Sequence, residues 1–262
     1  MHWGRWNGRA LALLLAMPAC MAADSASLLS PASIGKAQEG TPPLRVRRPE
    51  HKEMRAEAQP CTDDAMIIFD ASRSMAAAAG DNTGLRRIDS VRAALARILP
   101  RVAPRRRLGL ITYGPGSRPA CVNVSIELTP RLNAGEQILS RVEALKPDGR
   151  TPLTLAVRRA AEALNFRDRP VTIVLLTDGE ETCDGAPCAL AKMLKAQGAR
   201  TTVHVISYHI SSAIGSEGIF ASRCLADDTG GIYAETNTVD EVAAALDTAL
   251  ACPMVSEAHP ND

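Results

Sequence analysis

Residues 65–74 read Ala65-Met-Ile-Ile-Phe-Asp70-Ala-Ser72-Arg-Ser74, an apolar run followed at once by a carboxylate and two hydroxyls. A short apolar run of this kind predicts a buried strand over 65–69. A second run, Val171 to Leu176, precedes Thr177-Asp178-Gly179-Glu180 and predicts a central strand covered on both faces. Polar groups therefore follow directly after two buried strands.

Around these two strands, short apolar runs alternate with segments of helical period, which is typical of strands and crossover helices in a mostly parallel sheet. Residues 122–128 alternate with a period of two, which predicts an antiparallel edge strand with one face in water. The sequence thus predicts a doubly wound α/β fold with one antiparallel edge strand and helices on both faces. The other expected elements are a helix with the stripe Ile88, Val91, Leu95, Ile98, Leu99 ending at Pro100; strand Leu108–Tyr113; a helix containing Leu132, Ile138, Leu139, Val142 and Leu145; a helix with Thr151 as N-cap and Pro152 as its first residue; helix Ala189–Ala196; strand Thr202–Tyr208; helix Ile219–Ala226; strand Gly231–Ala234; and a last helix opened by the capping box of Thr238 and Glu241.

The N-terminus has the layout of a signal peptide. Arg5 and Arg9 precede the apolar run 11–16, and small residues follow up to Ala23, so residues 1–23 are predicted to be removed on export. The run is far shorter than the roughly 20 residues that span a bilayer, so no transmembrane span is expected in the mature chain. A lipid anchor at Cys20 is an open alternative.

The remaining chain divides into three predicted parts. Residues 24–60 contain many Pro, Ser, Gly and charged residues and too little apolar surface to fold, so they are expected to form a disordered tether. Residues 61–252 form the folded domain, and residues 253–262 form a C-terminal tail. At 262 residues the chain is long enough for one sizeable domain and short for two.

Charge and composition exclude several function classes. With 30 basic and 29 acidic residues the net charge is +1, which provides no general field for nucleic acid. The chain has no phosphate-binding loop motif and no nucleophile-elbow motif. His204 and His209 fall in or just after a strand, where a single histidine is more often structural than catalytic. We therefore expect binding rather than catalysis.

Six cysteines follow the predicted signal peptide, and an even number behind an export signal indicates three disulfides. Cys61 and Cys252 flank the domain and are expected to pair. Cys183 could pair with Cys188, but Cys121 would then have to reach Cys224 on the other side of the sheet. Pairing Cys121 with Cys183 and Cys188 with Cys224 avoids this crossing and is favoured, with the other arrangement left open.

Hard oxygen ligands follow the predicted strands at the sheet edge where open α/β folds place ligand sites. They are Asp70, Ser72, Ser74, Thr151 and Asp178. Singly, each residue has an ordinary structural role in a turn or helix cap. Their joint placement indicates a metal site.

This set resembles the metal-ion-dependent adhesion site of the von Willebrand factor A family, in which D-x-S-x-S is followed by a T and then by T-D-G. The resemblance covers roughly Ala65 to Leu250, and it is closest to stand-alone exported bacterial members. It implies that Ser72, Ser74 and Thr151 ligate the ion through hydroxyl oxygen, while Asp70 and Asp178 act directly or through water.

Oxygen ligands of this kind suit Mg²⁺, or Mn²⁺ or Ca²⁺. An ion held mostly by neutral hydroxyls keeps its positive charge and can accept a partner's carboxylate at an open position. The expected function is therefore metal-dependent binding of an acidic group on a protein or cell-envelope ligand, in the periplasm or at the cell surface. Arg73 and Arg150, at spacer positions of the motifs, could lower metal affinity or attract an anionic partner, and Glu180 and Glu181 are expected to form a solvated acidic turn.

Two other functions stay open on the sequence. A metal-dependent hydrolase could use Asp70 and Asp178, although it would need a base near the ion. A structural subunit of an envelope complex could carry a vestigial site.

Overall fold

The computed structural model describes residues 61, 63–80, 83–208 and 216–252. The predicted signal peptide, tether and tail, together with Cys20 and His209, lie outside the described residues.

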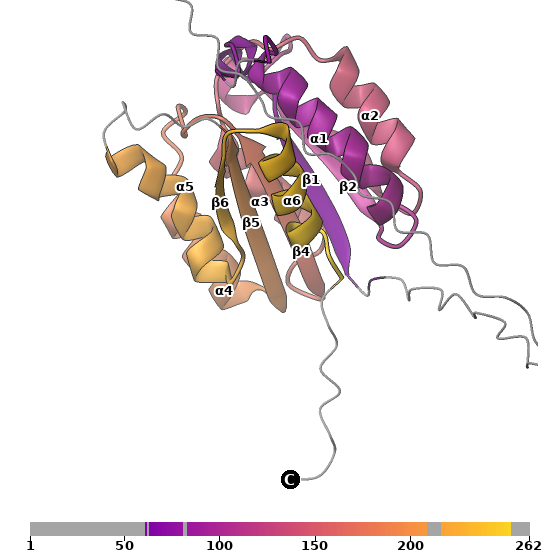
Figure 1. Ribbon diagram of the computed structural model, residues 1–262. Coiled ribbons are helices and arrows are strands. Elements are labelled where there is room, and N and C mark those ends of the chain that lie inside the picture. Colours follow the sequence, from indigo (N-terminus) through magenta and orange to yellow (C-terminus); the bar gives the residue numbers. More distant parts are fainter. Residues whose placement is uncertain (1–60, 62, 81–82, 209–215, 253–262) are drawn as a thin grey trace, which may run out of the picture. The chain divides into compact units, whose positions relative to one another are not determined.

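The described residues form a six-stranded sheet in the order β3-β2-β1-β4-β5-β6 (Figure 1). All neighbouring strands are parallel except β2 and β3, which are antiparallel. The predicted doubly wound fold with an antiparallel edge strand is confirmed. The strands are β1 (Asp64–Asp70), β2 (Leu108–Tyr113), β3 (Val124–Arg131), β4 (Pro170–Thr177), β5 (Arg200–Tyr208) and β6 (Tyr233–Thr236).

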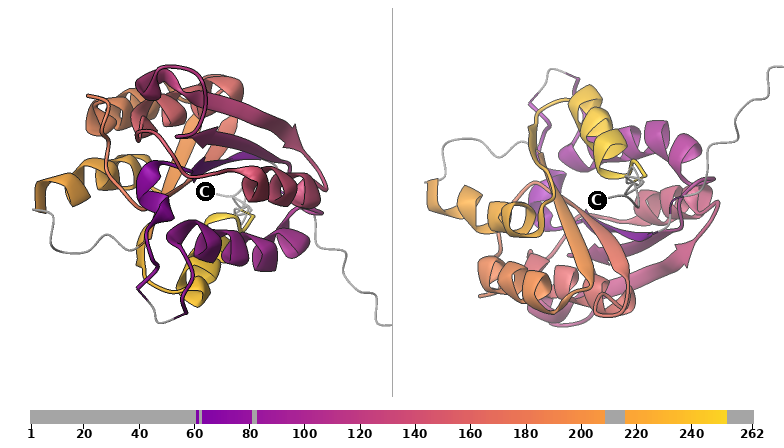
Figure 2. Two further views of the ribbon diagram at one scale, coloured as in Figure 1. Left: turned by 90° about the horizontal axis from the view of Figure 1, so that it is seen from above. Right: turned by 90° about the horizontal axis from the view of Figure 1, so that it is seen from below.

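Helices cover both faces of this sheet (Figures 1 and 2). Helices α1, α2 and α6 share one apolar cluster with the sheet, and α3, α4 and α5 share the other. The helices are α1 (Arg87–Val102), α2 (Gly135–Ala144), α3 (Leu153–Ala163), α4 (Pro187–Gln197), α5 (Ser216–Thr229) and α6 (Val239–Ala249), with short 3-10 turns η1 (Arg73–Ala76) and η2 (Ala120–Val122).

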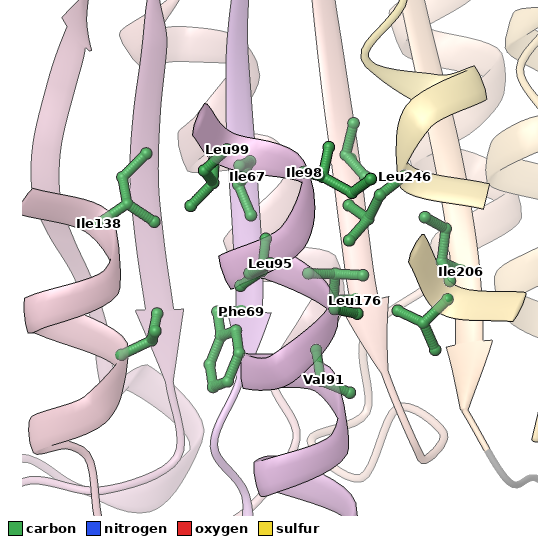
Figure 3. Packing of buried hydrophobic residues seen from close by; sticks show 14 of the residues in the cluster. Ile67, Phe69, Val91, Leu95, Ile98, Leu99, Ile138, Leu176, Ile206 and Leu246 are labelled. Atoms are coloured by element: carbon green, nitrogen blue, oxygen red, sulfur yellow. The ribbon is translucent and has the colours of Figure 1, made fainter. Parts of the chain in front are cut away.

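The alternation of side chains along β1 explains why it lies at the centre of both clusters. Ile67 and Phe69 point towards α1, where they meet Leu95 (Figure 3), whereas Met66 and Ile68 belong to the cluster on the opposite face. Each such fully buried side chain stabilises the fold by about 1.5–3 kcal/mol. The strand that carries Asp70 is therefore held firmly on both sides.

Three helix predictions need correction. Helix α1 does not end at Pro100 but continues to Val102, because a proline in the last turn removes only one internal hydrogen bond. Leu132 precedes α2 and is 44 % exposed. Thr151 does not cap α3: the helix begins at Leu153 with Pro152 as the capping residue. The predicted N-cap of α6 is confirmed, since the Glu241 amide donates to the Thr238 hydroxyl, whereas the Glu241 carboxylate accepts from the Asn237 amide rather than from that of Thr238.

The edge strand is also less regular than predicted. Val122 lies in η2 rather than in the strand, and Ile126 is 48 % exposed. Leu110 pairs with Leu128 and Ile111 with Ile126, so Glu127 is an extra residue accommodated in a bulge, and a second register shift lies between Leu108 and Leu110. The bulge turns Ile126 and Leu128 to opposite faces of the sheet and breaks the expected one-sided apolar stripe. At the other edge, the last strand begins at Tyr233, two residues later than predicted.

The two ends of the described domain are joined at the base of the sheet. Cys61 and Cys252 form a disulfide with a Cα–Cα distance of 5.0 Å, as predicted. Beside it, Arg106 pairs with Asp63 in the protein interior and donates to the Ala251 carbonyl at 2.9 Å. The other bridges are Cys121–Cys183 and Cys188–Cys224, the favoured arrangement. Three disulfides indicate an oxidising compartment.

His204 has a structural partner in the sheet. Its Nδ1 accepts a hydrogen bond of 3.1 Å from the Ile232 amide. Burial, and next the positive charge of Arg106, lower its pKa to about 4, so the ring is neutral near pH 7.

Within the described residues, no helix combines the length and the apolar composition needed to span a membrane.

Candidate metal centre

Three loops meet at the carboxyl ends of the strands, at the edge seen from above in Figure 2. The Ala71 amide donates to the Tyr113 carbonyl at 3.0 Å, and the Ala71 carbonyl accepts from the Asp148 amide at 3.0 Å. The Arg73 amide donates to the Gly149 carbonyl at 3.3 Å. The loop after β1 is thus bonded to the end of β2 and to the segment that precedes α3.

Two glycines allow this close stacking. Gly114 has φ of 113°, and a Cβ there would lie 2.4 Å from the Ala71 carbonyl oxygen. Gly149 has φ of 80°, and its Cβ would lie 2.2 Å from the Gly114 carbonyl oxygen. No other residue type fits these positions without moving the backbone.

A chain of hydrogen bonds joins most of the predicted ligands. The Ser72 amide donates to Asp70 Oδ1 at 2.7 Å, and the hydroxyls of Ser72 and Ser74 are 3.0 Å apart. The Ser74 hydroxyl donates to Asp178 Oδ1 at 2.6 Å. Asp70, Ser72, Ser74 and Asp178 therefore lie together, although the last of them is supplied by a distant part of the chain.

Thr151 lies on the neighbouring loop and is buried. Its amide donates to the Thr182 hydroxyl at 2.9 Å, which ties it to the loop after β4. Within the described residues its own hydroxyl makes no hydrogen bond to the cluster. Its role as a ligand stays a prediction.

Two residues outside the predicted set position Asp70. The Thr177 hydroxyl donates to Asp70 Oδ2 at 2.7 Å and accepts from the Tyr113 hydroxyl at 3.2 Å. Together with the Ser72 amide, Thr177 fixes both carboxylate oxygens. Thr177 belongs to the T-D-G motif and was within reach of sequence reasoning, whereas nothing local in the sequence marks Tyr113.

The pKa values of both carboxylates in the cluster are raised. Burial, and next the negative charge of Asp178, raise the pKa of Asp70 to about 6. Burial also raises the pKa of Asp178, although hydrogen bonds from Ser74 and Arg87 act in the opposite direction. Two buried carboxylates whose ionisation is opposed by burial form an environment in which a cation would be stabilising.

The donor set fits a hard divalent ion. The described residues contain no group of three or more His, Cys, Asp or Glu side chains able to hold a metal, so a site here depends on the serine hydroxyls as well as on the acids. Each carboxylate and hydroxyl oxygen has two lone pairs and keeps acceptor capacity beyond the bonds described. Oxygen donors of this kind match the preference of Mg²⁺, Mn²⁺ and Ca²⁺.

The loop after β4 is braced, and the expectation of a merely solvated acidic turn there is wrong. Glu181 accepts hydrogen bonds of 2.8 Å from the amides of Thr154 and Cys183, so its carboxylate satisfies the start of α3 in place of Thr151. Glu180 has a buried carboxylate oxygen without a hydrogen-bond partner. The Cys121–Cys183 disulfide links this loop to the segment before β3.

Arginines surround the cluster. Arg73 pairs with Asp148 at 2.9 Å on the surface, and Arg150 donates to the Thr182 carbonyl at 3.2 Å. Arg87, the first residue of α1, donates to Asp178 Oδ2 at 3.0 Å. Sequence reasoning missed Arg87, because only the fold brings the start of α1 to the end of β4.

Comparison with known proteins agrees with this architecture. Residues 65–181 match the model of the von Willebrand factor type A domain. The chain is 30 % identical over 199 residues to the uncharacterized protein YwmD of Bacillus subtilis (strain 168), covering 71 % of this chain and 84 % of that protein.

Solved structures with the same fold have lower sequence identity. The conserved hypothetical protein BatB from Bacteroides thetaiotaomicron has a TM-score of 0.52 at 16 % identity, covering 71 % of this chain and 98 % of that one. The PilB minor pilin from Streptococcus sanguinis has a TM-score of 0.53 at 17 % identity, covering 73 % of this chain and 61 % of that one. With the sheet order, the loop motifs and the relative from Bacillus subtilis taken together, this chain belongs to the von Willebrand factor type A domain family.

Proposed function

We propose that this protein is an exported binding module that uses a divalent cation to capture an acidic group on a partner protein or envelope ligand. The observation that carries the proposal is the hydrogen-bonded cluster of Asp70, Ser72, Ser74 and Asp178 at the carboxyl edge of the sheet. Four oxygen-bearing side chains from two separate loops converge there, and both carboxylates are buried.

Asp70, Ser72, Ser74, Thr151 and Asp178 would hold the ion, directly or through water. When bound, Mg²⁺ or Mn²⁺ would supply positive charge and an open coordination position for a carboxylate from outside the chain. Thr177 and Tyr113 keep Asp70 oriented, and the Cys121–Cys183 bridge restrains the loop that follows Asp178. The site is thus largely preformed, which lowers the ordering cost of binding.

Arginines beside the site favour a partner with several acidic residues. Arg118 and Arg159 both donate to the Val124 carbonyl, at 3.2 and 2.6 Å. Arg150 lies 3.9 Å from the Cys121 sulfur, and Arg158 lines a depression of about 350 Å³ whose walls also carry Glu181 and Asp184. None of these four arginines takes part in the ion pairs of the described residues. Their charge is therefore available to an acidic segment that flanks the metal-bound carboxylate.

Titration calorimetry with MgCl₂ and MnCl₂ tests the metal site. The wild-type protein should bind one equivalent, and Asp70→Ala should bind at least tenfold more weakly. The control Asp148→Ala removes an exposed carboxylate on the neighbouring loop and should bind as the wild type does. Equal binding by the wild type and Asp70→Ala rejects the proposal.

Carboxylate capture has its own readout. With Mn²⁺ bound, the proton relaxation of acetate should be enhanced in the wild type and not in Asp70→Ala, because only an ion with an open position brings acetate close. Turnover of phosphoesters that is lost in Asp70→Ala would instead favour the hydrolase.

Hexaglutamate tests the proposed preference for a partner with several acidic residues. It should bind the wild type more tightly than acetate does, and salt should weaken its binding. The double variant Arg150→Gln/Arg158→Gln should lose this preference and still bind acetate. Arg97→Gln/Arg101→Gln, on α1, is the charge-matched control. An equal effect of the two double variants would reject a specific basic surface.

A further inference from the structure

Arg87 forms a bond with Asp178 that the proposed metal site does not explain. Arg87 Nη1 lies 3.0 Å from Asp178 Oδ2, and the Asp178 side chain is fully buried while that of Arg87 is 22 % exposed. The two residues are 91 positions apart. This is a tertiary ion pair at the centre of the candidate site, not a local pairing along a helix.

The backbone before α1 holds Arg87 in this position. The Arg87 amide donates to the Ala77 carbonyl at 2.9 Å, and the Ala79 amide donates to the Leu85 carbonyl at 2.8 Å. These bonds pair the residues just after η1 with the residues just before and at the start of α1. The first residue of α1 therefore lies close to the turn that carries Ser74.

Within the described residues, Arg87 is the only cationic side chain that forms an ion pair with either carboxylate of the cluster. The two oxygens of Asp178 are divided between Ser74 and Arg87, whereas those of Asp70 accept from neutral groups. The Nε of Arg87 is buried without a hydrogen-bond partner. Its guanidinium therefore pairs with the carboxylate that a metal ion would also need.

We propose that Arg87 is an internal counter-cation of this site and sets its metal affinity. In the metal-free protein its charge offsets that of Asp178. A divalent ion near Asp178 is repelled by the guanidinium and competes with it for the same carboxylate, so Arg87 opposes metal binding. This inference rests on the proposed function, but it also makes a statement about the metal-free protein.

The first test compares metal affinities of Arg87→Gln, Arg87→Lys and Arg73→Gln. Glutamine keeps a hydrogen-bond donor for Asp178 and removes the charge, and lysine keeps the charge. Arg73→Gln removes an equal charge from the metal loop, where the side chain is 79 % exposed and pairs with Asp148. By calorimetry with MnCl₂, Arg87→Gln should bind at least tenfold more tightly than the wild type, with less than a threefold change for Arg87→Lys and Arg73→Gln.

The second test needs no metal. In the presence of chelator, Arg87→Gln should have a lower melting temperature than the wild type. The same substitution should have a much smaller effect in an Asp178→Asn background, because the charge that Arg87 offsets is then absent. An equal effect in both backgrounds overturns the inference. The cycle also shows whether Arg87→Gln folds.

The outcomes separate this inference from the proposed function. Equal metal affinity of the wild type and Arg87→Gln, or equal gains in Arg87→Gln and Arg73→Gln, overturns the role of Arg87 and leaves the metal site standing. Binding by Arg87→Gln alone supports the role of Arg87 and rejects metal use by the wild type. Binding by neither protein overturns both.

Discussion

Ser74 and Asp178 lie 104 positions apart in the chain, yet the Ser74 hydroxyl donates a hydrogen bond of 2.6 Å to the Asp178 carboxylate. The bond connects the loop after β1 to the loop after β4, at the point where the two central strands end. It makes the candidate metal centre a property of the folded sheet and not of either motif.

Ser74→Ala should weaken Mn²⁺ binding at least tenfold and cost only about 1 kcal/mol of unfolding free energy, because it removes one hydroxyl of the proposed ligand set and one hydrogen bond. Calorimetry and urea denaturation measure the two effects. Ser117→Ala, an exposed serine, is the control. Unchanged metal affinity in Ser74→Ala would remove this residue from the ligand set.

Gly149→Ala should destabilise the protein by about 2–4 kcal/mol and reduce metal binding, because the new Cβ would lie 2.2 Å from the Gly114 carbonyl oxygen and force the stacked loops apart. Gly230→Ala is the matched control: its φ is also positive, at 74°, but no atom lies within 4 Å of the added Cβ. It should cost about 1 kcal/mol from backbone strain alone. If urea denaturation gave equal losses of unfolding free energy for the two variants, the close stacking of the loops at Gly149 would make no contribution to stability.

Removing the Cys61–Cys252 bridge should cost more stability than removing Cys188–Cys224. The bridges close segments of 191 and 36 residues, and the chain-entropy model assigns the longer one an advantage of about 1.5 kcal/mol. Double Cys→Ser variants compared by denaturant unfolding measure the difference. The reverse order would mean that native-state interactions outweigh loop closure.

Acid should destabilise the protein partly through His204. Its pKa in the folded protein is about 4, below the ordinary value near 6.5, so the unfolded chain binds the proton first as the pH falls. The stability contributed by the neutral ring is fully present above about pH 6.5 and is lost by about 3 kcal/mol as the pH falls to 4. His204→Gln should show a correspondingly smaller decrease between pH 7 and 4. An identical pH dependence of the unfolding free energy in both proteins would contradict this role.

Sequence patterns predict the elements of this fold well where one physical effect dominates. The runs at 65–69 and 171–176 are buried in both clusters, and their positions at the sheet centre follow from continuous apolar character. Prediction fails where tertiary contacts decide. A bulge places Leu128 on the opposite face of the sheet from Ile126, and Thr151 loses its expected capping role because the carboxylate of Glu181 reaches the same helix end.

The same division applies to the candidate centre. Asp70, Ser72, Ser74 and Asp178 are predictable because each directly follows a buried strand, and the structure brings them together. The roles of Tyr113 and Arg87 could not be predicted, because neither residue belongs to a local motif. Tyr113 contacts Thr177, 64 positions away, and Arg87 contacts Asp178, 91 positions away. The electrostatic balance of the site was therefore hidden from sequence reasoning.

The Cys61–Cys252 bridge also determines how a force applied to the ends of the domain is carried. The chain enters and leaves the described domain at residues whose Cα atoms are 5.0 Å apart, and Asp70 lies at the opposite end of β1. A stretching force applied between the two ends of the domain would be carried by the Cys61–Cys252 disulfide and would not stretch the sheet. A pull between the N-terminal side and a partner bound at the proposed site would instead run along β1, whose hydrogen bonds to β2 and β4 on both sides would resist it in shear.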